Sequence, residues 1–496
     1  MDPSQTGRNR RVSDSKGTFV KRGGNLQAAI DNAKFGDVIV LEAGATFRGP
    51  IMLPYKEGGQ SGEYITITTS NDNGIPRENE RVVPDLHAQA MPKIVGPNGA
   101  VAVGTAERAH HYKFIGIEFS PASDSQYLYN LIDFGRSDYK SISQFPHDLI
   151  LDRCYIHASG LNKARRGVGL NSGDASIINS HISGFAGAED ETQGVCGWNG
   201  PGPFHIVNNY IEGGGQNIMF GGADPAVPNL VPSDIEIRKN FLYKPAEWFG
   251  HATIKAVIEL KNARKVTIDG NVLECAGLTN AFVLTVRNQS GGAPWSILED
   301  ITVTNNIVRH SAAAFSLLGQ DTIQQSQKAK QIRIANNLLV DVIPDYSAVF
   351  IAECCGDGVI VENNTVQQAG NIITCYGPPT ANFIFRNNIV QYNSYGINCP
   401  ANALAAGSKG NIILDNAGAI AANGQPATIP LGNFVVSTLA QIGFVDSVNG
   451  DWSLSAQSRV KRRATDGNDP GVNFKVLATA VAATDVEPPY FGKRKK

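Results

Sequence analysis

Three charged residues in the middle of the chain have the types and spacing for proton abstraction from an acidic sugar: Glu259, Lys261 and Arg287. Removing the proton next to a sugar carboxylate requires a base and a positive charge that neutralises the carboxylate. A Lys beside an Arg has its pKa lowered by the like charge, so Lys261 is the candidate base and Arg287 the candidate carboxylate ligand. The pattern predicts β-elimination of a uronate-containing polysaccharide, with Glu259 orienting the sugar. The alternative is a solvated salt bridge on a β-sheet face.

This grouping depends on stacking the segments RGVGLNS, GVCGWNG, NIMFGG, AVIELKNA, FVLTVRNQ and FSLLGQ as equivalent strands. Side chains alternate in a strand, so bulky residues placed inside leave their neighbours outside. The residues placed inside are Leu170, Trp198, Phe220, Leu260, Val286 and Leu318. The outward column then holds Asn171, Asn199, Gly221, Lys261, Arg287 and Gly319. Because stacked strands lie about 4.8 Å apart, we expect Lys261 and Arg287 to be neighbours in an exposed groove.

Polar and aromatic residues around these three are candidates for binding the sugar chain. The candidates are Asn171, Asn199, Trp248, His251, Asn288 and Arg309. Trp248 and His251 lie in the long loop YKPAEWFGHATIK. An aromatic ring in such a loop can stack on a sugar or pack on the coil beneath it, and the sequence leaves both open.

A rival chemistry, glycoside hydrolysis, needs two carboxyl groups on either side of the scissile bond. Glu259 could pair with Asp224, which lies in the loop GGADPAVPNLVP. The run Glu189, Asp190 and Glu191 precedes the same face and could bind Ca²⁺ or supply an acid, although such runs are usually solvated. A third interpretation is a polysaccharide-binding or structural protein without turnover, in which polar ladders serve stability alone.

The histidines give no indication of a metal site. Five are scattered through the repeats without HxxxH spacing: His157, His181, His205, His251 and His310. The segments DSVNGD (446–451) and TDGNDPG (465–471) have oxygen-rich spacing that suits Ca²⁺, but ordinary Asx turns explain both.

The elements that would position these residues are marked by a two-residue tag, usually Asn-Asn, inside short apolar runs. The tag occurs in IVNNYI, IRKNFL, IDGNVL, VTNNIV, IANNLL, VENNTV and FRNNIV. Its second residue falls at positions 209, 240, 271, 306, 337, 364 and 388, so the steps are 31, 31, 35, 31, 27 and 24 residues. Repeats of this length are typical of a solenoid, and an Asn at the same corner of every coil can pass hydrogen bonds along the stack. The sequence predicts a parallel β-helix with loops of varying length.

The N-terminal part predicts a cap for this solenoid. In the segment GGNLQAAIDNAKFG, Asn25 can cap a short helix whose apolar face includes Leu26 and Ile30 and which ends at Gly36. An amphipathic helix across the open end of a solenoid shields its core from water.

The segment GGNLQAAIDNAKFGDVIVLEAGATFRGPIMLP resembles the N-terminal cap of the pectin-lyase-like, right-handed parallel β-helix superfamily. Residues 196–240 and 258–274 are similar to a group of bacterial, secreted β-helix proteins, and the likeness covers about residues 20–480, including the closing segment GFVDSVNGDWSLSAQSRVKRRATDGNDPGVNF. The resemblance implies the fold. Several lyases of the superfamily use a Lys/Arg pair as base and carboxylate ligand, the roles assigned above to Lys261 and Arg287. The superfamily also contains hydrolases, esterases, epimerases and inert fibres, so the reaction stays open.

We therefore expect one all-β domain. Residues 1–18 are expected to be disordered, 19–430 to form the β-helix with its cap helix near 25–35, 431–486 to close the far end and 487–496 to form a basic tail. A solenoid grows in one dimension, which allows a single domain in a chain of 496 residues.

Composition narrows the compartment and the partners. The net charge of −2 gives no reason to expect binding to nucleic acid, and no apolar stretch is long enough to span a bilayer. The start of the chain lacks the apolar core of a secretion signal, so either the protein stays inside the cell or a signal has been removed. The resemblance to secreted β-helix proteins favours an extracellular or periplasmic protein whose signal is not part of this chain. Seven cysteines argue against a disulfide framework, although Cys375 and Cys399 are 24 residues apart, one coil step, and could pair.

Overall fold

The fold is known from a computed structural model of the chain. The described residues are 17–158, 160–275, 279–342, 349–352, 356–377, 381–393, 396–399, 412–414, 416–420, 431–436, 438–482 and 484. The predicted basic tail and most of the predicted disordered N-terminal segment lie outside these ranges, as do Cys354 and Cys355.

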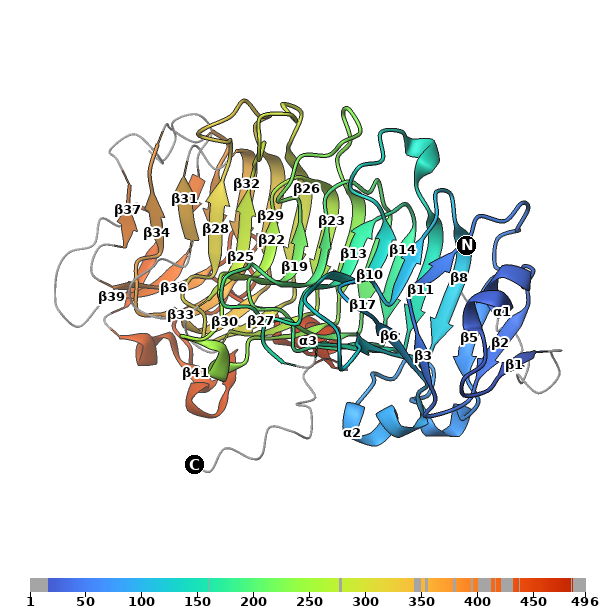
Figure 1. The fold of residues 1–496 in the computed structure, drawn as a ribbon. Helices are drawn as coiled ribbons and strands as arrows, with labels where there is room; N and C mark the ends of the chain where they lie inside the picture. The colour runs from blue at the N-terminus through green and yellow to red at the C-terminus, as the bar shows by residue number, and fades with distance from the viewer. Residues whose placement is uncertain are drawn as a thin grey trace.

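The chain forms a right-handed parallel β-helix, which confirms the predicted fold class (Figure 1). Each coil passes through three long parallel sheets, which we call A, B and C, with 14, 14 and 12 strands. Within one coil, the described strands of the three sheets therefore do not pair with one another. Each strand pairs with the equivalent strand of the coil before and the coil after, so side chains about 30 residues apart become neighbours.

Most of the regular structure lies in these three sheets. Sheet A contains β1 (Thr18–Val20), β2 (Val38–Leu41), β5 (Ile65–Thr69), β8 (His110–Ile115), β11 (His147–Asp152), β14 (Ala175–Ile178), β17 (Phe204–Val207), β20 (Ser233–Arg238), β23 (Ala263–Asp269), β26 (Leu298–Thr304), β29 (Lys330–Ala335), β32 (Asp357–Glu362), β35 (Ile384–Arg386) and β38 (Ile412–Leu414). Sheet B contains β3 (Thr46–Arg48), β6 (Lys93–Gly96), β9 (Glu118–Pro121), β12 (Tyr155–His157), β15 (His181–Ser183), β18 (Tyr210–Glu212), β21 (Phe241–Tyr243), β24 (Val272–Glu274), β27 (Ile307–Arg309), β30 (Leu338–Val342), β33 (Thr365–Gln368), β36 (Ile389–Asn393), β39 (Ala417–Ile420) and β40 (Phe434–Val436). Sheet C contains β4 (Ile51–Leu53), β7 (Val103–Thr105), β10 (Leu128–Gly135), β13 (Ala164–Asn171), β16 (Gln193–Gly197), β19 (Gln216–Phe220), β22 (Ala256–Leu260), β25 (Asn280–Thr285), β28 (Phe315–Leu318), β31 (Val349–Ala352), β34 (Ile373–Cys375) and β37 (Ile397–Asn398).

A few short elements decorate the sheets. The α-helices are α1 (Leu26–Asn32), α2 (Pro84–His87) and α3 (Phe474–Val481), and β41 (Phe444–Asp446) and β42 (Asp451–Leu454) form an antiparallel pair. The 3₁₀ turns are η2 (Asp72–Gly74), η3 (Ala88–Ala90), η4 (Ile142–Gln144), η5 (Ala246–Trp248), η6 (Leu439–Ile442) and η7 (Ser447–Asn449).

The core is built from stacks of like residues on the inner faces of the strands. One stack in sheet A runs through aligned positions that are all 2% exposed or less: Ile177, Ile206, Ile237, Ile268, Val303, Ile334, Val361 and Phe385. Burying each such side chain stabilises the fold by about 1.5–3 kcal/mol, so the apolar runs hold the coils in register.

The Asn-Asn tag forms the corner between sheets A and B, and its two residues do different work. The first residue of the tag adopts a left-handed conformation, with φ of 57° at Asn208 and 55° at Asn305, which Asn tolerates better than most residues. The second residue is buried and bonds to its equivalent in the next coil. At Asn240 the backbone N–H donates to Oδ1 of Asn271 (2.9 Å) and the side-chain amide donates to the same atom (3.0 Å).

The same pair of bonds recurs at every step along this corner. The residues joined in this way are Asn209, Asn240, Asn271, Asn306, Asn337, Asn364, Asn388, Asn416 and Asn433. The amides from Asn209 to Asn416 also donate to a carbonyl of the preceding coil, as Asn271 does to Ile237 (2.9 Å). The ladder therefore satisfies buried backbone groups at the turn.

Helix α1 closes the N-terminal end, as predicted. Asn25 accepts from the N–H of Ala28 (3.0 Å), and Leu26 and Ile30 are buried. The helix ends at Asn32, four residues before the predicted Gly36. The Gln27 amide exchanges two hydrogen bonds with the backbone of Met52 (both 2.8 Å), so it occupies the open edge of sheet C at β4.

The C-terminal segment covers more than the far end of the solenoid. One part packs at that end, where Ile442 and Val460 contact Val436 of β40. The chain then runs back along the outer face of sheet B, and α3 lies beside the middle of the rod (Figure 1). Leu477 and Val481 of α3 belong to a cluster with the outward-facing apolar residues Tyr210, Phe241, Val272, Ile307 and Leu338. The expectation of a simple end closure was therefore incomplete, because sheet B carries an apolar stripe that needs a cover.

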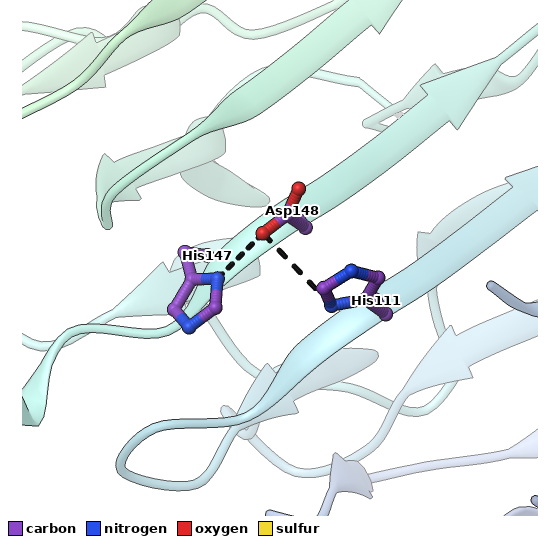
Figure 2. A group of neighbouring side chains, drawn as sticks. All are labelled: His111, His147 and Asp148. Atoms are coloured by element: carbon purple, nitrogen blue, oxygen red, sulfur yellow. Dashed lines mark hydrogen bonds and ion pairs between the residues drawn. The ribbon is translucent and has the colours of Figure 1, made fainter. Parts of the chain in front are cut away.

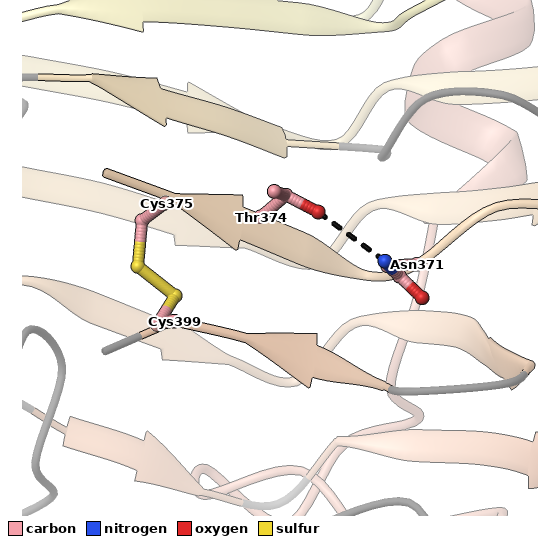
Figure 3. The surroundings of a disulfide bond; sticks show 4 residues. All are labelled: Asn371, Thr374, Cys375 and Cys399. Atoms are coloured by element: carbon pink, nitrogen blue, oxygen red, sulfur yellow. Dashed lines mark hydrogen bonds between the residues drawn. A yellow bond between two sulfur atoms is a disulfide. The ribbon is translucent and has the colours of Figure 1, made fainter. Parts of the chain in front are cut away.

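Cys375 of β34 and Cys399 form a disulfide across adjacent coils of sheet C (Figure 3). Three other cysteines, Cys154, Cys196 and Cys275, are buried free thiols. None of the helices in the described part of the chain has the length and apolar character needed to span a membrane.

Candidate functional site

A groove of about 430 Å³ lies on the outer face of sheet C, over β22 and β25. Its lining residues are Lys255, Glu259, Lys261, Val283, Thr285, Arg287, Asn288, Gln289, Asp321, Ile323 and Gln324. The groove contains the three residues that the sequence analysis selected for chemistry, together with two charged residues that it missed, Lys255 and Asp321.

Glu259 forms the floor of the groove and is 2% exposed. Its two oxygens lie between two ammonium groups, with Lys261 Nζ at 3.6 Å from Oε1 and Lys255 Nζ at 3.6 Å from Oε2. Gln216 also donates to Oε2 (2.6 Å). A buried carboxylate must be paired and hydrogen-bonded, and these contacts meet that requirement.

Arg287 lies on the next coil and is linked to Lys261 through the backbone, since its N–H donates to the Lys261 carbonyl (3.0 Å). Its guanidinium contacts Asp321 (Nη1 to Oδ1, 3.2 Å) and is 32% exposed. Burial would raise the pKa of Asp321, but the N–H groups of Ile323, Asn288 and Gln324 and the charge of Arg287 lower it below its usual range. Asp321 therefore stays ionised and holds Arg287 at the edge of the groove.

A row of buried polar side chains leads along sheet C to the groove. Arg166 donates to Asn130 (3.4 Å) and to Gln193 (2.9 Å), Gln193 donates to Gln216 (2.8 Å), and Gln216 donates to Glu259. The row crosses five consecutive strands, from β10 to β22, and fixes the orientation of the Glu259 carboxylate. The sequence analysis missed it, although Asn130, Arg166, Gln193 and Gln216 occupy equivalent positions in four successive sheet C strands.

Asp133 lies beside the upper end of this row and accepts from Asn130 (3.1 Å). Burial raises the pKa of Asp133 to about 7, against the opposing effects of Asn130 and the Arg166 charge. A carboxyl group that titrates near neutral pH thus lies on the same face as the groove.

The stacking register differs from the predicted one at three places. Leu260 pairs with Leu284 rather than with the predicted Val286, so Arg287 lies two residues beyond the level of Lys261. A shift of two residues does not change the face of a strand, and both side chains still point outward into the groove. Leu317, rather than Leu318, enters the core.

The prediction that Trp198 lies in the core is wrong as well. Gly197 pairs with Phe220 and takes the inward position, where a side chain would meet the Leu170 carbonyl at 2.3 Å. Trp198 packs outside the core on Cys196 and Met219, with the Arg166 guanidinium 4.9 Å from its ring.

Three of the asparagines proposed to contact sugar are engaged by the protein itself. Asn171 and Asn199 are 1% and 0% exposed, and Asn171 accepts from the N–H groups of Trp198 (3.1 Å) and Asn199 (2.9 Å). Asn199 donates to the Arg136 and Tyr139 carbonyls. Asn288 lines the groove but donates to the Gln325 carbonyl (2.7 Å) and is 1% exposed. All three side chains stabilise loops at the ends of sheet C strands.

The remaining candidates lie away from the groove lining. Asp224 accepts from the N–H groups of Ser290 and Gly292 (both 2.9 Å), so it fixes a loop beside the groove. Trp248 is 8% exposed at the end of η5, and His251 is exposed in the loop that follows. Arg309 belongs to β27 of sheet B, on another face of the rod.

Of the acidic run 189–191, Glu191 contacts a residue that lines the groove. Glu191 contacts Lys255 (3.2 Å), and Gln216 donates to it (3.2 Å) as well as to Glu259. Asp190 accepts from the Tyr127 hydroxyl (2.7 Å), and Glu189 is exposed. The Lys255 ammonium lies between the carboxylates of Glu191 and Glu259, where a Ca²⁺ ion would have to displace it.

Comparison with known proteins finds likeness in fold. No protein-family model matches the sequence, and no curated protein matches it. Among solved structures, the chain is similar to the PL6 family alginate lyase AlyGC, with a TM-score of 0.55 and 16% identity over 92% of this chain and 58% of that one. It is also similar to a mannuronic acid-specific family 6 polysaccharide lyase from human gut microbiota, with a TM-score of 0.51 and 13% identity over 85% and 91% of the two chains. The chain thus spans somewhat over half the length of AlyGC, and the likeness lies in the β-helix.

Proposed function

We propose that the protein cleaves a uronate-containing polysaccharide by β-elimination in the groove of sheet C. The observation that carries the proposal is that Lys261 and Arg287, from adjacent coils, line one groove whose floor is the buried Glu259. Lys255 adds a third cation to the lining. A groove rich in cations suits a polymer that carries one carboxylate on each sugar.

In this proposal Arg287 binds the uronate carboxylate, and the charge that it neutralises would otherwise oppose removal of the adjacent proton. Lys261, in its neutral form, takes the proton from the carbon next to the carboxyl group. The electron pair left on that carbon forms a double bond to the neighbouring carbon, and the bond from the neighbouring carbon to the glycosidic oxygen breaks. The leaving oxygen takes up a proton from water and Lys261 returns its proton to solvent, so the products are a new chain end and an unsaturated uronate.

Glu259 has a positioning role in this scheme. Its contacts with Lys261 and Lys255 hold both amino nitrogens over the groove, and the polar row through Gln216 holds Glu259 itself. Since Lys261 is only 11% exposed, its reach into the groove is set by this support.

The fold likeness guides the choice of first substrates. The two similar structures are named as an alginate lyase and a mannuronic acid-specific lyase, so alginate and its mannuronate-rich blocks head the panel to be tested. Other uronate polymers follow, since the groove's cations recognise a carboxylate rather than one sugar.

Hydrolysis is the second candidate and has weaker support. It requires a second carboxyl group across the scissile bond from Glu259. Asp224 accepts hydrogen bonds from the backbone of residues 290–292. Glu191, in contrast, contacts Lys255 and Gln216, the same two residues that contact Glu259. A hydrolase would therefore use Glu191 with Glu259. The third candidate function is polysaccharide binding without turnover.

One assay separates these three functions. The protein is incubated with the panel of uronate polymers and with neutral glucans, while ultraviolet absorbance and reducing ends are followed together. A lyase produces both signals in parallel, a hydrolase produces reducing ends alone, and a binding protein produces neither but is retained on the immobilised polymer. The proposal predicts the first outcome on uronate polymers only, and reducing ends without absorbance would overturn it.

We also propose that the protein works outside the cytoplasm, because polysaccharides of this kind are found there. The disulfide between Cys375 and Cys399 supports this placement, since disulfides persist in oxidising compartments. Fractionation of the native host with an antibody to the protein tests it, and a purely cytoplasmic signal would contradict it.

A further inference from the structure

A second cluster of chemically active side chains lies on sheet A, on a different face from the groove. His111 of β8 and His147 and Asp148 of β11 bring their ligand atoms within 4.8 Å of one another (Figure 2). The three side chains are therefore close enough to share a metal ion. The two strands pair directly, with His147 opposite His110, so the cluster joins adjacent coils.

The Asp148 carboxylate lies between the two imidazoles. Its Oδ2 is 2.6 Å from Nδ1 of His147 and 3.9 Å from Nδ1 of His111. The His111 side chain is 9% exposed, that of Asp148 29% and that of His147 46%, so one side of the cluster is open to water. Such an arrangement leaves a coordination position for solvent or another ligand.

The rings are held in place by their neighbours, as metal-binding histidines usually are. His110 stacks on His147 (ring centroids 5.0 Å apart, planes at 4°) and on Phe35 (5.1 Å). Nε2 of His110 lies 3.0 Å from the Lys56 carbonyl, which can only accept, so in the neutral ring Nδ1 accepts from Nδ1–H of His111 (2.8 Å). His111 then carries its lone pair on Nε2.

The charge around the cluster favours a cation. Asp174, on the next coil, lies close enough to interact with Asp148, His147 and His111. Asp148 and Asp174 bring two carboxyl groups to the cluster, and a divalent ion would offset their charge.

We propose that His111, His147 and Asp148 bind a divalent transition-metal ion, with Zn²⁺ as the best match. Two imidazole nitrogens and one carboxylate oxygen suit Zn²⁺, whereas Ca²⁺ and Mg²⁺ prefer oxygen ligands alone. Zinc bonds of about 2.0–2.2 Å place tetrahedral ligands roughly 3.3–3.5 Å apart, so the His111 ring must turn to bring Nε2, which carries its lone pair, to the ion beside Asp148. The ion replaces the proton between His147 and Asp148 and ties β8 to β11.

The site is tested by calorimetric titration of ZnCl₂ into the untagged full-length protein after removal of metals with a chelator. The expected result is one Zn²⁺ per chain with a dissociation constant of about 1 µM or below. Replacing a half-exposed ligand should not unfold the chain, so His147→Ala and Asp148→Asn are the test variants. Asn tolerates the φ of +53° at position 148. Each variant should weaken binding at least ~10-fold.

The matched control is His205→Ala. His205 belongs to the same sheet and pairs with one carboxylate, Glu236 (2.9 Å), with a similar 41% exposure. This variant should bind Zn²⁺ as the wild type does. A second readout is the visible spectrum of the Co²⁺-loaded protein, which should show four-coordinate bands that the His147→Ala variant lacks.

Two results would overturn the proposal. One is no heat of binding and no cobalt bands for the wild-type protein at 100-fold excess of metal. The other is binding that survives unchanged in His147→Ala and Asp148→Asn. Neither result bears on the groove of sheet C, since the two sites lie on different sheets.

Discussion

Arg287 is the residue on which recognition of the substrate carboxylate depends in the proposed site. Replacing it with Ala removes a preorganised cation, so kcat/KM on the uronate polymer should fall by about 10²–10³-fold. Arg287→Lys should recover part of that loss through KM, because it restores the charge without the forked geometry. Arg264→Ala is the control, since Arg264 pairs with Glu299 on sheet A (2.7 Å) and is similarly exposed at 41%. Equal rates for wild type and Arg287→Ala would contradict the assignment.

Asp133 gives a pH-dependent prediction. Burial raises its pKa from 3.8 to about 7, so the folded chain holds this proton more tightly than the unfolded chain. The contribution of Asp133 to the free energy of unfolding therefore falls as pH rises from about 4 to 7. Asp133→Asn cannot ionise, and at pH 8 it should be more stable than the wild type by roughly 2–4 kcal/mol, with the advantage gone at pH 4.

Urea unfolding at both pH values measures this difference. The exposed Asp138 pairs with Arg136 (2.7 Å), and Asp138→Asn serves as the control with little change at either pH. The explanation fails if Asp133→Asn and wild type differ by the same amount at pH 4 and pH 8.

Residues that face a partner in another coil were the hardest to identify from sequence. Glu259, Lys261 and Arg287 were found because each lies in or just after a recognisable strand. His111 and His147 were missed because a search for HxxxH looks along one helix, whereas here the ligands are 36 positions apart on stacked strands. The dipeptides His110-His111 and His147-Asp148, at the starts of equivalent strands, were the available signal.

At the scale of the structural element, the asparagine corner joins each coil to the next by buried hydrogen bonds. Asn271 accepts two hydrogen bonds from Asn240 and donates to Ile237. Asn271→Ala leaves these buried groups without partners, so the free energy of unfolding should fall by about 2–4 kcal/mol. Asn32→Ala, at the exposed end of α1, should change it by about 0.5 kcal/mol or less. Chemical denaturation compares the two, and an equal effect would show that the ladder contributes nothing specific.

The coil repeat could be predicted because the tag and the apolar stacks obey the same period. The register within a coil could not be predicted everywhere. Trp198 was placed inside on account of its size, but the adjacent Gly197 fits where backbone strands approach too closely for any side chain. A one-residue slip of this kind exchanges the two faces locally, whereas the two-residue shift at Arg287 leaves its face unchanged.

At the scale of the whole molecule, α3 protects an apolar stripe on sheet B that would otherwise be exposed. Leu477 is 2% exposed and packs on the stripe, whereas its neighbour Val476 is 47% exposed. Leu477→Asp should detach the helix, increase binding of a hydrophobic dye and promote aggregation. Val476→Asp, the matched control in the same helix, should leave all three unchanged. Equal dye binding in the two variants would mean that α3 is not the cover.

The sequence did not reveal this cover, because the helix and the stripe lie more than 130 residues apart between Leu477 and Leu338. The sequence analysis assigned residues 431–486 only to closing the far end of the solenoid. The apolar face of the short helix has a packing partner only in the folded rod, where the coils align the apolar side chains of Tyr210, Phe241, Val272, Ile307 and Leu338.

The account depends most on Lys261 acting as a base in the groove. The direct measurement is the initial rate of ultraviolet absorbance increase on the cleaved uronate polymer for the wild type, Lys261→Ala and the control Lys265→Ala, whose exposed side chain lies on sheet A. We predict that Lys261→Ala loses about 10²–10⁴-fold in rate while Lys265→Ala matches the wild type. A Lys261→Ala variant that keeps the full wild-type rate would contradict the account.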